Sequence, residues 1–194
     1  MRYPPEQKEK TRLEILDVAG RVFRERGYDG IGVDGVAAEA QLTSGALYKH
    51  FRSKSALFRE VLRLGLVRLA AGINRFQQQG RADWLPLLAD WYMSAAHRAD
   101  LGKGCALPSL SPEVVKADSE TRSLYQEGLL AAVTALMRAP PFRDAKDGRQ
   151  HAWATLALLA GGVTLSRAVA DPALADEIAS AVRDVLAATG KDPS

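Results

Sequence analysis

Apolar residues recur at helical spacing along most of the chain, and the most informative pattern lies between Val33 and Phe51. A first stripe is formed by Val33, Val36, Ala37 and Ala40, at the i, i+3, i+4, i+7 positions that share one face of a helix. A second stripe, Leu47 and Phe51, follows a short turn in which Thr43 can cap the second helix through its hydroxyl. Two short helices joined by a turn predict a helix-turn-helix.

The off-stripe residues of the second helix are expected to point outward. They are Ser44, Gly45, Tyr48 and Lys49. A glycine in the first turn costs a helix up to about 1 kcal/mol, and a close approach by another backbone would explain it.

The remaining pattern predicts helices and no β-hairpin, which places the chain in the all-α class. Gly27 is expected to end the first helix in a left-handed conformation, and Ser53 to cap the fourth. Residues 100–112 allow at most a broken helix, with Ser111-Pro112 as a cap and first helical position. The expected helices cover residues 8–26, 33–40, 43–51, 53–79, 84–97, 118–139, 147–170 and 173–188.

We therefore expect an N-terminal three-helix DNA-binding unit over residues 1–60 and a helical remainder over residues 61–194. The long helix that follows Ser53 leaves the first unit and enters the second without a linker. It would connect the two mechanically.

The net charge of +3 is unevenly distributed. Residues 41–82 hold eight Lys or Arg against one Asp or Glu, whereas residues 1–40 hold seven against eight and residues 83–194 hold eleven against fourteen. A positive block that coincides with a helix-turn-helix indicates a polyanion as partner. A solvated basic face is the alternative.

Two segments together resemble the DNA-binding domain of the tetracycline-repressor-like (TetR) family of transcriptional regulators. They read TRLEILDVAGRVFRERGYDGIGV and VAAEAQLTSGALYKHFRSKSALFREVL, and they include the Leu-Tyr-x-His-Phe signature at 47–51. The resemblance implies a homodimer in which each third helix enters a major groove. It also implies that the remainder binds a ligand and dimerises.

Carried over by position, the resemblance assigns DNA contact to Thr43, Ser44, Gly45, Tyr48, Lys49, His50 and Lys54. Tyr48, His50 and Lys54 are the phosphate-contact candidates, whereas Leu42, Leu47 and Phe51 match core positions. Two departures stand out. Many relatives have Lys or Arg where this chain has Ser44, and Gly32 replaces the Thr or Ser that usually opens the second helix.

Each DNA assignment has an alternative. Tyr48 suits a half-buried ring, Lys49 and Lys54 suit solubility charges, and His50 suits a hydrogen bond to a neighbouring backbone group.

The second half carries candidates for an effector pocket: Phe76, Trp84, Trp91, Tyr92, His97, Cys105, Tyr125 and Trp153. Aromatic residues at helical spacing also suit an ordinary core, but as a set they suggest an apolar or aromatic effector. The Gly-Cys pair at 104–105 resembles an element of some family members. Cys105 then fits either an oxidant sensor or, as we favour, a small core residue.

The last two helices, Trp153–Leu165 and Leu174–Leu186, are rich in Ala, Leu and Val, and Gly161-Gly162 permits a close approach. We expect them to form a homodimer. Packing within one internal core is the alternative.

Together these features predict a cytoplasmic, ligand-responsive regulator, most simply a repressor released from a double-stranded DNA operator by a small molecule. A DNA-organising protein without a pocket is the rival interpretation. An enzyme is not expected, because the chain contains no HExxH, P-loop, GxSxG or metal-ligand cluster. No cofactor, metal, membrane segment or internal disulfide is expected either.

Overall fold

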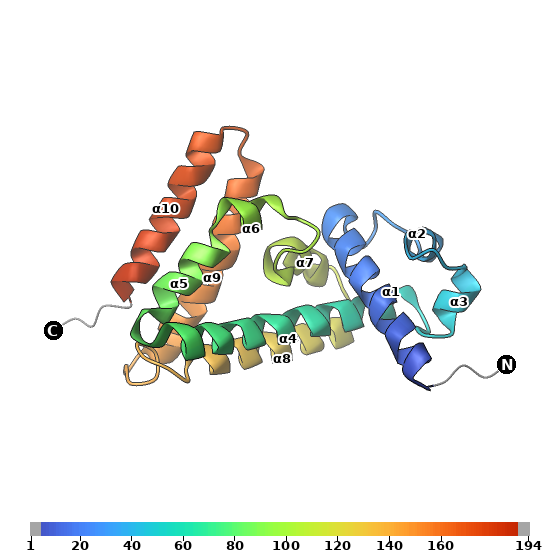
Figure 1. The fold of residues 1–194 in the computed structure, drawn as a ribbon, viewed down its shortest axis with the longest axis horizontal. Coiled ribbons are helices and arrows are strands. Elements are labelled where there is room, and N and C mark those ends of the chain that lie inside the picture. Colours follow the sequence, from blue (N-terminus) through green and yellow to red (C-terminus); the bar gives the residue numbers. More distant parts are fainter. Residues whose placement is uncertain (1–4, 190–194) are drawn as a thin grey trace. The chain divides into compact units, whose positions relative to one another are not determined.

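The computed structural model describes residues 5–189, and every regular element in that range is helical (Figure 1). The predicted all-α class is therefore confirmed. The α-helices are α1 Pro5–Arg26, α2 Val33–Glu39, α3 Ser44–Tyr48, α4 Lys54–Gly80, α5 Trp84–Tyr92, α6 Ala95–Ala99, α7 Ala106–Val115, α8 Ser119–Leu136, α9 Gly148–Ala168 and α10 Pro172–Thr189, with a short 3₁₀ turn η1 at Arg81–Asp83.

The helix ends follow the capping chemistry of the sequence. Gly27 closes α1 with φ of +74°, the left-handed conformation that glycine adopts at little cost. The Thr43 hydroxyl accepts a hydrogen bond from the Ala46 amide at 3.2 Å, and the Ser53 hydroxyl accepts one from the Ala56 amide at 3.1 Å. These three predicted ends are confirmed.

The single helix predicted over residues 84–97 is instead two helices, α5 and α6. Ser94 interrupts it in an extended conformation and caps α6, because its hydroxyl accepts from the His97 amide at 3.2 Å. A side-chain cap competing with the backbone ladder explains the break.

The prediction of at most a broken helix over residues 100–112 holds for residues 100–105, which are not helical, but is wrong from Ala106 onward. Helix α7 begins there, and Ser111-Pro112 lies in its interior and does not start a helix. Pro108 lies in the first turn, where a missing N–H costs no helical hydrogen bond. Pro112 does remove one, but burial of an apolar stripe outweighs this cost. That stripe consists of Ala106, Leu107, Leu110 and Val114, each at most 5% exposed.

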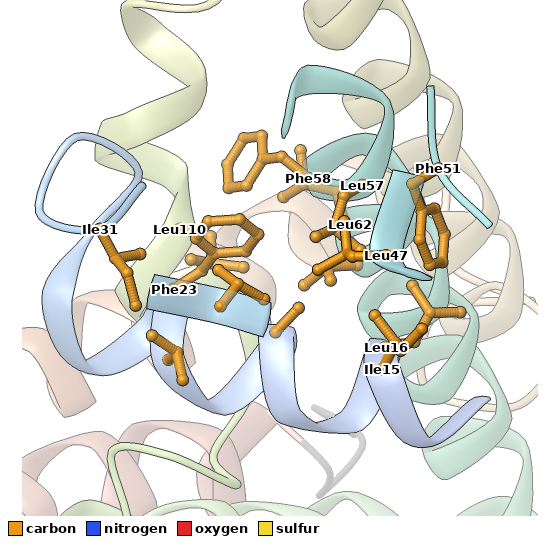
Figure 2. Packing of buried hydrophobic residues seen from close by; sticks show 14 of the residues in the cluster. Ile15, Leu16, Phe23, Ile31, Leu47, Phe51, Leu57, Phe58, Leu62 and Leu110 are labelled. Atoms are coloured by element: carbon orange, nitrogen blue, oxygen red, sulfur yellow. The ribbon is translucent and has the colours of Figure 1, made fainter. Parts of the chain in front are cut away.

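The chain packs as two compact units. The first contains residues up to Gly65 together with Leu101–Tyr125, so α7 lies with the N-terminal helices. Figure 2 shows its core, in which Phe23, Leu47, Phe58 and Leu110 gather from α1, α3, α4 and α7. Leu42 packs against this cluster, and the predicted core roles of Leu42, Leu47 and Phe51 are confirmed.

The second unit contains Leu66–Asp100 and the chain from Gln126 onward. Here α10 packs on α9 and α5. The second half of α8 lies along the second half of α4, where the Gln77 side-chain amide donates to the Ala135 carbonyl at 2.9 Å. Both α4 and α8 pass through both units. A functional boundary at residue 60 remains a prediction.

Candidate DNA interface

Helix α3 is held in place by a tight turn and one buried anchor. Gln41 adopts a left-handed φ of +56°, and the Leu42 amide then donates to the Ala37 carbonyl at 2.8 Å. Leu47 is fully buried beneath α3. Although α3 has only five helical residues, its cap and anchor fix which side faces solvent.

The outward side of α3 carries most of the predicted contact residues. Thr43, Gly45 and Lys49 are exposed, and Tyr48 is 50% exposed. Among the described residues, no atom outside the immediate backbone lies within 4 Å of the position that a Gly45 β-carbon would occupy. The fold itself therefore gives no reason for this glycine, and it leaves room for a close external approach.

Ser44 is partly buried and bonded to an acidic neighbour. Its hydroxyl donates to an Asp34 carboxylate oxygen from the first turn of α2. With its proton committed, the Ser44 oxygen offers lone pairs, which suit an amino group of cytosine or adenine in a major groove. This contact between Ser44 and Asp34 was not predicted from the sequence.

His50 lies at the end of α3, partly buried, and its buried Nδ1 has no hydrogen-bond partner in the described structure. Burial, then the positive charges of Lys8 and Arg12, lower the pKa of His50, and Glu9 opposes them. The ring is therefore neutral at pH 7, and any contact with a phosphate would be a hydrogen bond from N–H and not an ion pair.

The positive block is partly neutralised within the fold. Arg59 pairs with Asp118 and Glu120 at 3.3 Å, and Arg63 pairs with Glu60 at 2.9 Å. These arginines support the structure of the unit, which their sequence alone did not reveal.

Lys49 and Arg52 are exposed, and no ion pair holds either of them in the described range. Sequence reasoning missed Arg52, although its place between Phe51 and Ser53 in the basic block was a signal. Lys54 is placed differently, because its ammonium lies 4.1 Å from the centre of the Tyr28 ring. A phosphate contact by Lys54 would compete with this cation–π contact.

The predicted weakness at the start of α2 is present. Gly32 occupies the N-cap in an extended conformation and makes no side-chain cap bond. The open space around it would accommodate a side chain.

The eight effector-pocket candidates are divided between the two units. Four of those in the second unit form a connected aromatic cluster: Phe76, Trp91, Tyr92 and His97, with ring centres 4.6–6.1 Å apart along the chain of contacts. Trp91 is 47% exposed. Burial, opposed by a hydrogen bond at the Tyr92 carbonyl, lowers the pKa of His97.

The other two candidates of the second unit differ. Trp84 is buried against Phe142 and donates to the Pro140 carbonyl at 2.7 Å, as a packed core residue does, and Trp153 is half-buried. Cys105 and Tyr125 lie in the first unit. Cys105 is the N-cap of α7, and the Tyr125 hydroxyl bonds to Ser111. Burial raises the pKa of Tyr125. Their roles in effector binding remain predictions.

Comparison with known proteins identifies the N-terminal helices. Residues 15–61 match the family model of bacterial regulatory proteins of the tetR family. This match spans α2, α3 and every predicted DNA-contact residue. These residues form a TetR-family DNA-binding domain.

Two relatives of the N-terminal helices are named as helix-turn-helix transcriptional regulators. The transcriptional regulator AcrR of Shigella flexneri is 40% identical over 85 residues, which are 44% of this chain and 40% of AcrR. The transcriptional repressor DhaR of a Mycobacterium species is 28% identical over 104 residues, 54% of this chain and 52% of DhaR. The chain thus spans about half or less of these relatives' lengths.

The fold also matches a solved structure over almost the whole length of this chain. The reduced form of Escherichia coli NemR superposes with a TM-score of 0.78 and 19% identity, covering 91% of this chain and 95% of NemR. At this identity the match shows the fold alone.

Residues 5–189 show neither a candidate membrane span nor a candidate metal site. Across residues 5–189 no helix is both long and apolar enough to cross a membrane. The same range contains no group of three or more His, Cys, Asp or Glu side chains arranged to hold a metal ion.

Proposed function

We propose that this TetR-family chain is a homodimeric transcriptional regulator that reads operator DNA with α3. In the dimer, the two copies of α3 would enter successive major grooves about 34 Å apart. Phosphate contacts would come from Tyr48, Lys49 and Arg52, and base readout from the exposed start of the helix.

The observation that supports this proposal most directly is the outward face of α3. It combines a glycine that no contact in the fold requires, a half-exposed tyrosine and two cations that have no ion-pair partner among residues 5–189. Exposed cations attract a polyanion, and Gly45 lets a backbone or base edge approach closely. A surface of purely solvating charge would not need Gly45.

A second copy of the chain is the proposed occupant of the apolar face of α9 and α10. Leu165 on α9 is 58% exposed, and Leu174 and Val185 on α10 are 42% and 51% exposed. Gly161 lies one turn before Leu165, and beyond its own helix backbone no described atom lies within 4 Å of its β-carbon position. A mid-helix glycine costs about 1 kcal/mol, and close packing by a partner helix would offset that cost.

Repression with release by an effector is the proposed mode of action. DhaR and NemR are both named as transcriptional repressors. The cluster around Trp91 favours an apolar or aromatic effector, because aromatic rings offset-stack on one another. A coupling of about 1–3 kcal/mol between effector and DNA would change operator affinity roughly 5- to 150-fold.

Selection from a random double-stranded DNA library, followed by titration at several salt concentrations, tests DNA reading. If each subunit neutralises three or four phosphates, the log–log slope of affinity against salt is about −5 to −7. Lys49→Ala and Arg52→Ala should each reduce the slope by about 1 or 2 in the dimer. Lys146→Ala, an exposed lysine of the second unit, is the matched control.

Absence of any enriched DNA sequence would contradict the proposal, as would an affinity that salt does not change. Naphthalene provides a first effector probe, read as Trp fluorescence quenching and as release of the selected DNA. A DNA-organising protein is the rival function, and it predicts enrichment of DNA shape without any release by aromatic compounds.

A further inference from the structure

The first unit contains a cleft that lies away from α3 and has a volume of about 210 Å³. It lies where the turn after α1, the start of α4, the end of α7 and the start of α8 meet. At roughly 30 Å³ for each water molecule, the space suits a ligand of a few heavy atoms and not a drug-sized effector. Its lining residues are Tyr28, Asp29, Ser55, Phe58, Glu113, Lys116, Ala117, Asp118 and Thr121.

Aromatic rings form one part of the lining. The Tyr28 and Phe58 ring centres are 4.9 Å apart, at an angle of 60°. The Tyr28 ring already accepts the ammonium group of Lys54, 4.1 Å from its centre. The ring therefore already holds one cation in the native fold, and a second cation would have to use the remaining surface of the ring or displace Lys54.

Carboxylates form another part, and two of them are uncompensated. Asp118 is occupied, because it accepts the Thr121 amide at 2.7 Å and pairs with Arg59. The side-chain carboxylates of Asp29 and Glu113 have neither an ion pair nor a hydrogen bond in the described structure. The single cation of the lining, Lys116, is exposed.

The position of Glu113 depends on Gly27. A β-carbon at Gly27 would lie 3.0 Å from the Glu113 Oε1 atom, so the carboxylate rests against bare backbone. Burial, then Asp29 and Asp118, raise the pKa of Tyr28, and Arg59 opposes them. The order of these effects is consistent with a negative potential around the Tyr28 hydroxyl.

We propose that this cleft binds a small organic monocation, an alkylammonium group seated against Tyr28 and Phe58 with Glu113 and Asp29 as counter-charges. Aromatic rings together with carboxylates are the surroundings that recognise such groups. A bare metal ion fits less well, since no three potential ligands converge in the described residues. This site is separate from both α3 and the aromatic cluster around Trp91, and it does not depend on the proposed DNA function.

Choline and its neutral isostere 3,3-dimethylbutan-1-ol provide the decisive pair of probes, because they share shape and differ in charge. Isothermal titration of the full chain should give saturable binding of choline, with the isostere weaker by about tenfold or more. Equal binding of the two compounds would overturn the proposal. So would a choline titration without saturable binding.

A charge-removing variant locates the site. Glu113→Gln keeps the side-chain shape and should weaken choline binding by about fivefold or more. Glu127→Gln changes an exposed glutamate of α8 outside the cleft and should leave binding unchanged. Asp29→Asn repeats the test at the other unpaired carboxylate should Glu113→Gln fail to fold. If all variants bind choline like the parent chain, the cleft is not its site, whatever the DNA experiments show.

Discussion

At Gly45, folding and DNA binding are expected to favour different residues. No contact within the described chain forbids a side chain there. Gly45→Ala should therefore stabilise the chain, by at most about 1 kcal/mol in helix propensity. It should also weaken DNA binding, because the added methyl group lies on the outward side of α3.

Urea denaturation and DNA titration of the same variant measure these two opposite effects. Gly72→Ala is the matched control, since Gly72 is a helical glycine with equally open surroundings in the second unit. It should stabilise the chain without changing DNA affinity. Unchanged DNA affinity in Gly45→Ala would remove the main support for α3 as the reading helix.

His50 makes stability depend on pH. Its pKa in the folded chain is lowered by burial and then by Lys8 and Arg12, so the unfolded chain binds the proton more readily. Stability should be complete above the unfolded pKa of about 6.5 and should fall as pH drops through the lower folded pKa.

Unfolding of the parent chain and of His50→Gln at about pH 7.5 and 5.5 tests this, in a window above the titration of ordinary carboxylates. The loss of stability between the two pH values should be smaller in the variant. His97 shares the same direction and leaves a residual loss. His151→Gln, at an exposed position of α9, serves as control. An identical pH dependence in His50→Gln and the parent would contradict the prediction.

At the scale of elements, α2 begins in the first unit without a side-chain cap. Gly32→Ser would add a hydroxyl at the N-cap, where φ of −82° and ψ of 171° suit serine without strain. We expect a gain of a few tenths of a kcal/mol from the cap, and up to about 1 kcal/mol more from reduced freedom of the unfolded chain.

The same hydroxyl would lie at the exposed helix start, where it could donate to a phosphate, so DNA affinity should rise as well. Gly32→Ala separates the effects, because it restricts the unfolded chain but cannot cap or donate. Equal DNA affinities for the Ser and Ala variants would exclude a hydroxyl–phosphate bond at this position.

Helix ends that depend on local chemistry were predictable from the sequence. Helix α7, which depends on burial of its apolar side chains, was not. Gly27, Thr43 and Ser53 act through their own backbone or hydroxyl chemistry, which the sequence states directly. Helix α7 depends on four apolar side chains finding partners distant along the chain, and this burial outweighs Pro112. Ion pairs such as Arg59 with Asp118 join residues 59 positions apart and were equally invisible.

At the scale of the molecule, the sequence predicted which face of α3 points outward but not the packing that supports this helix. The residues of α3 were predicted because the spacing of Leu47 and Phe51 determines the outward face. The inclusion of Leu101–Tyr125 in the same compact unit was not predicted, since it depends on packing of α7 against α1. The cleft between these segments was therefore missed as well.

The dimer is the prediction that belongs to the whole molecule. Leu165→Glu places a charge in the centre of the proposed interface, where a second copy would bury it without a partner, and it should convert the dimer to a monomer. Leu87→Glu is the matched control, because Leu87 on α5 is also a well-exposed leucine of the second unit, at 46%.

Sedimentation equilibrium measures the association of the two subunits directly, and DNA titration provides a second, independent measurement. The proposed dimer would bind two half-sites at once. A Leu165→Glu monomer should therefore retain its helical content but lose most of its affinity for a two-fold symmetric site. It should bind a single half-site as weakly as one arm of the parent does. If Leu165→Glu remains dimeric while Leu87→Glu dissociates, the partner copy covers α5 and not α9 and α10, and the open space at Gly161 needs another explanation.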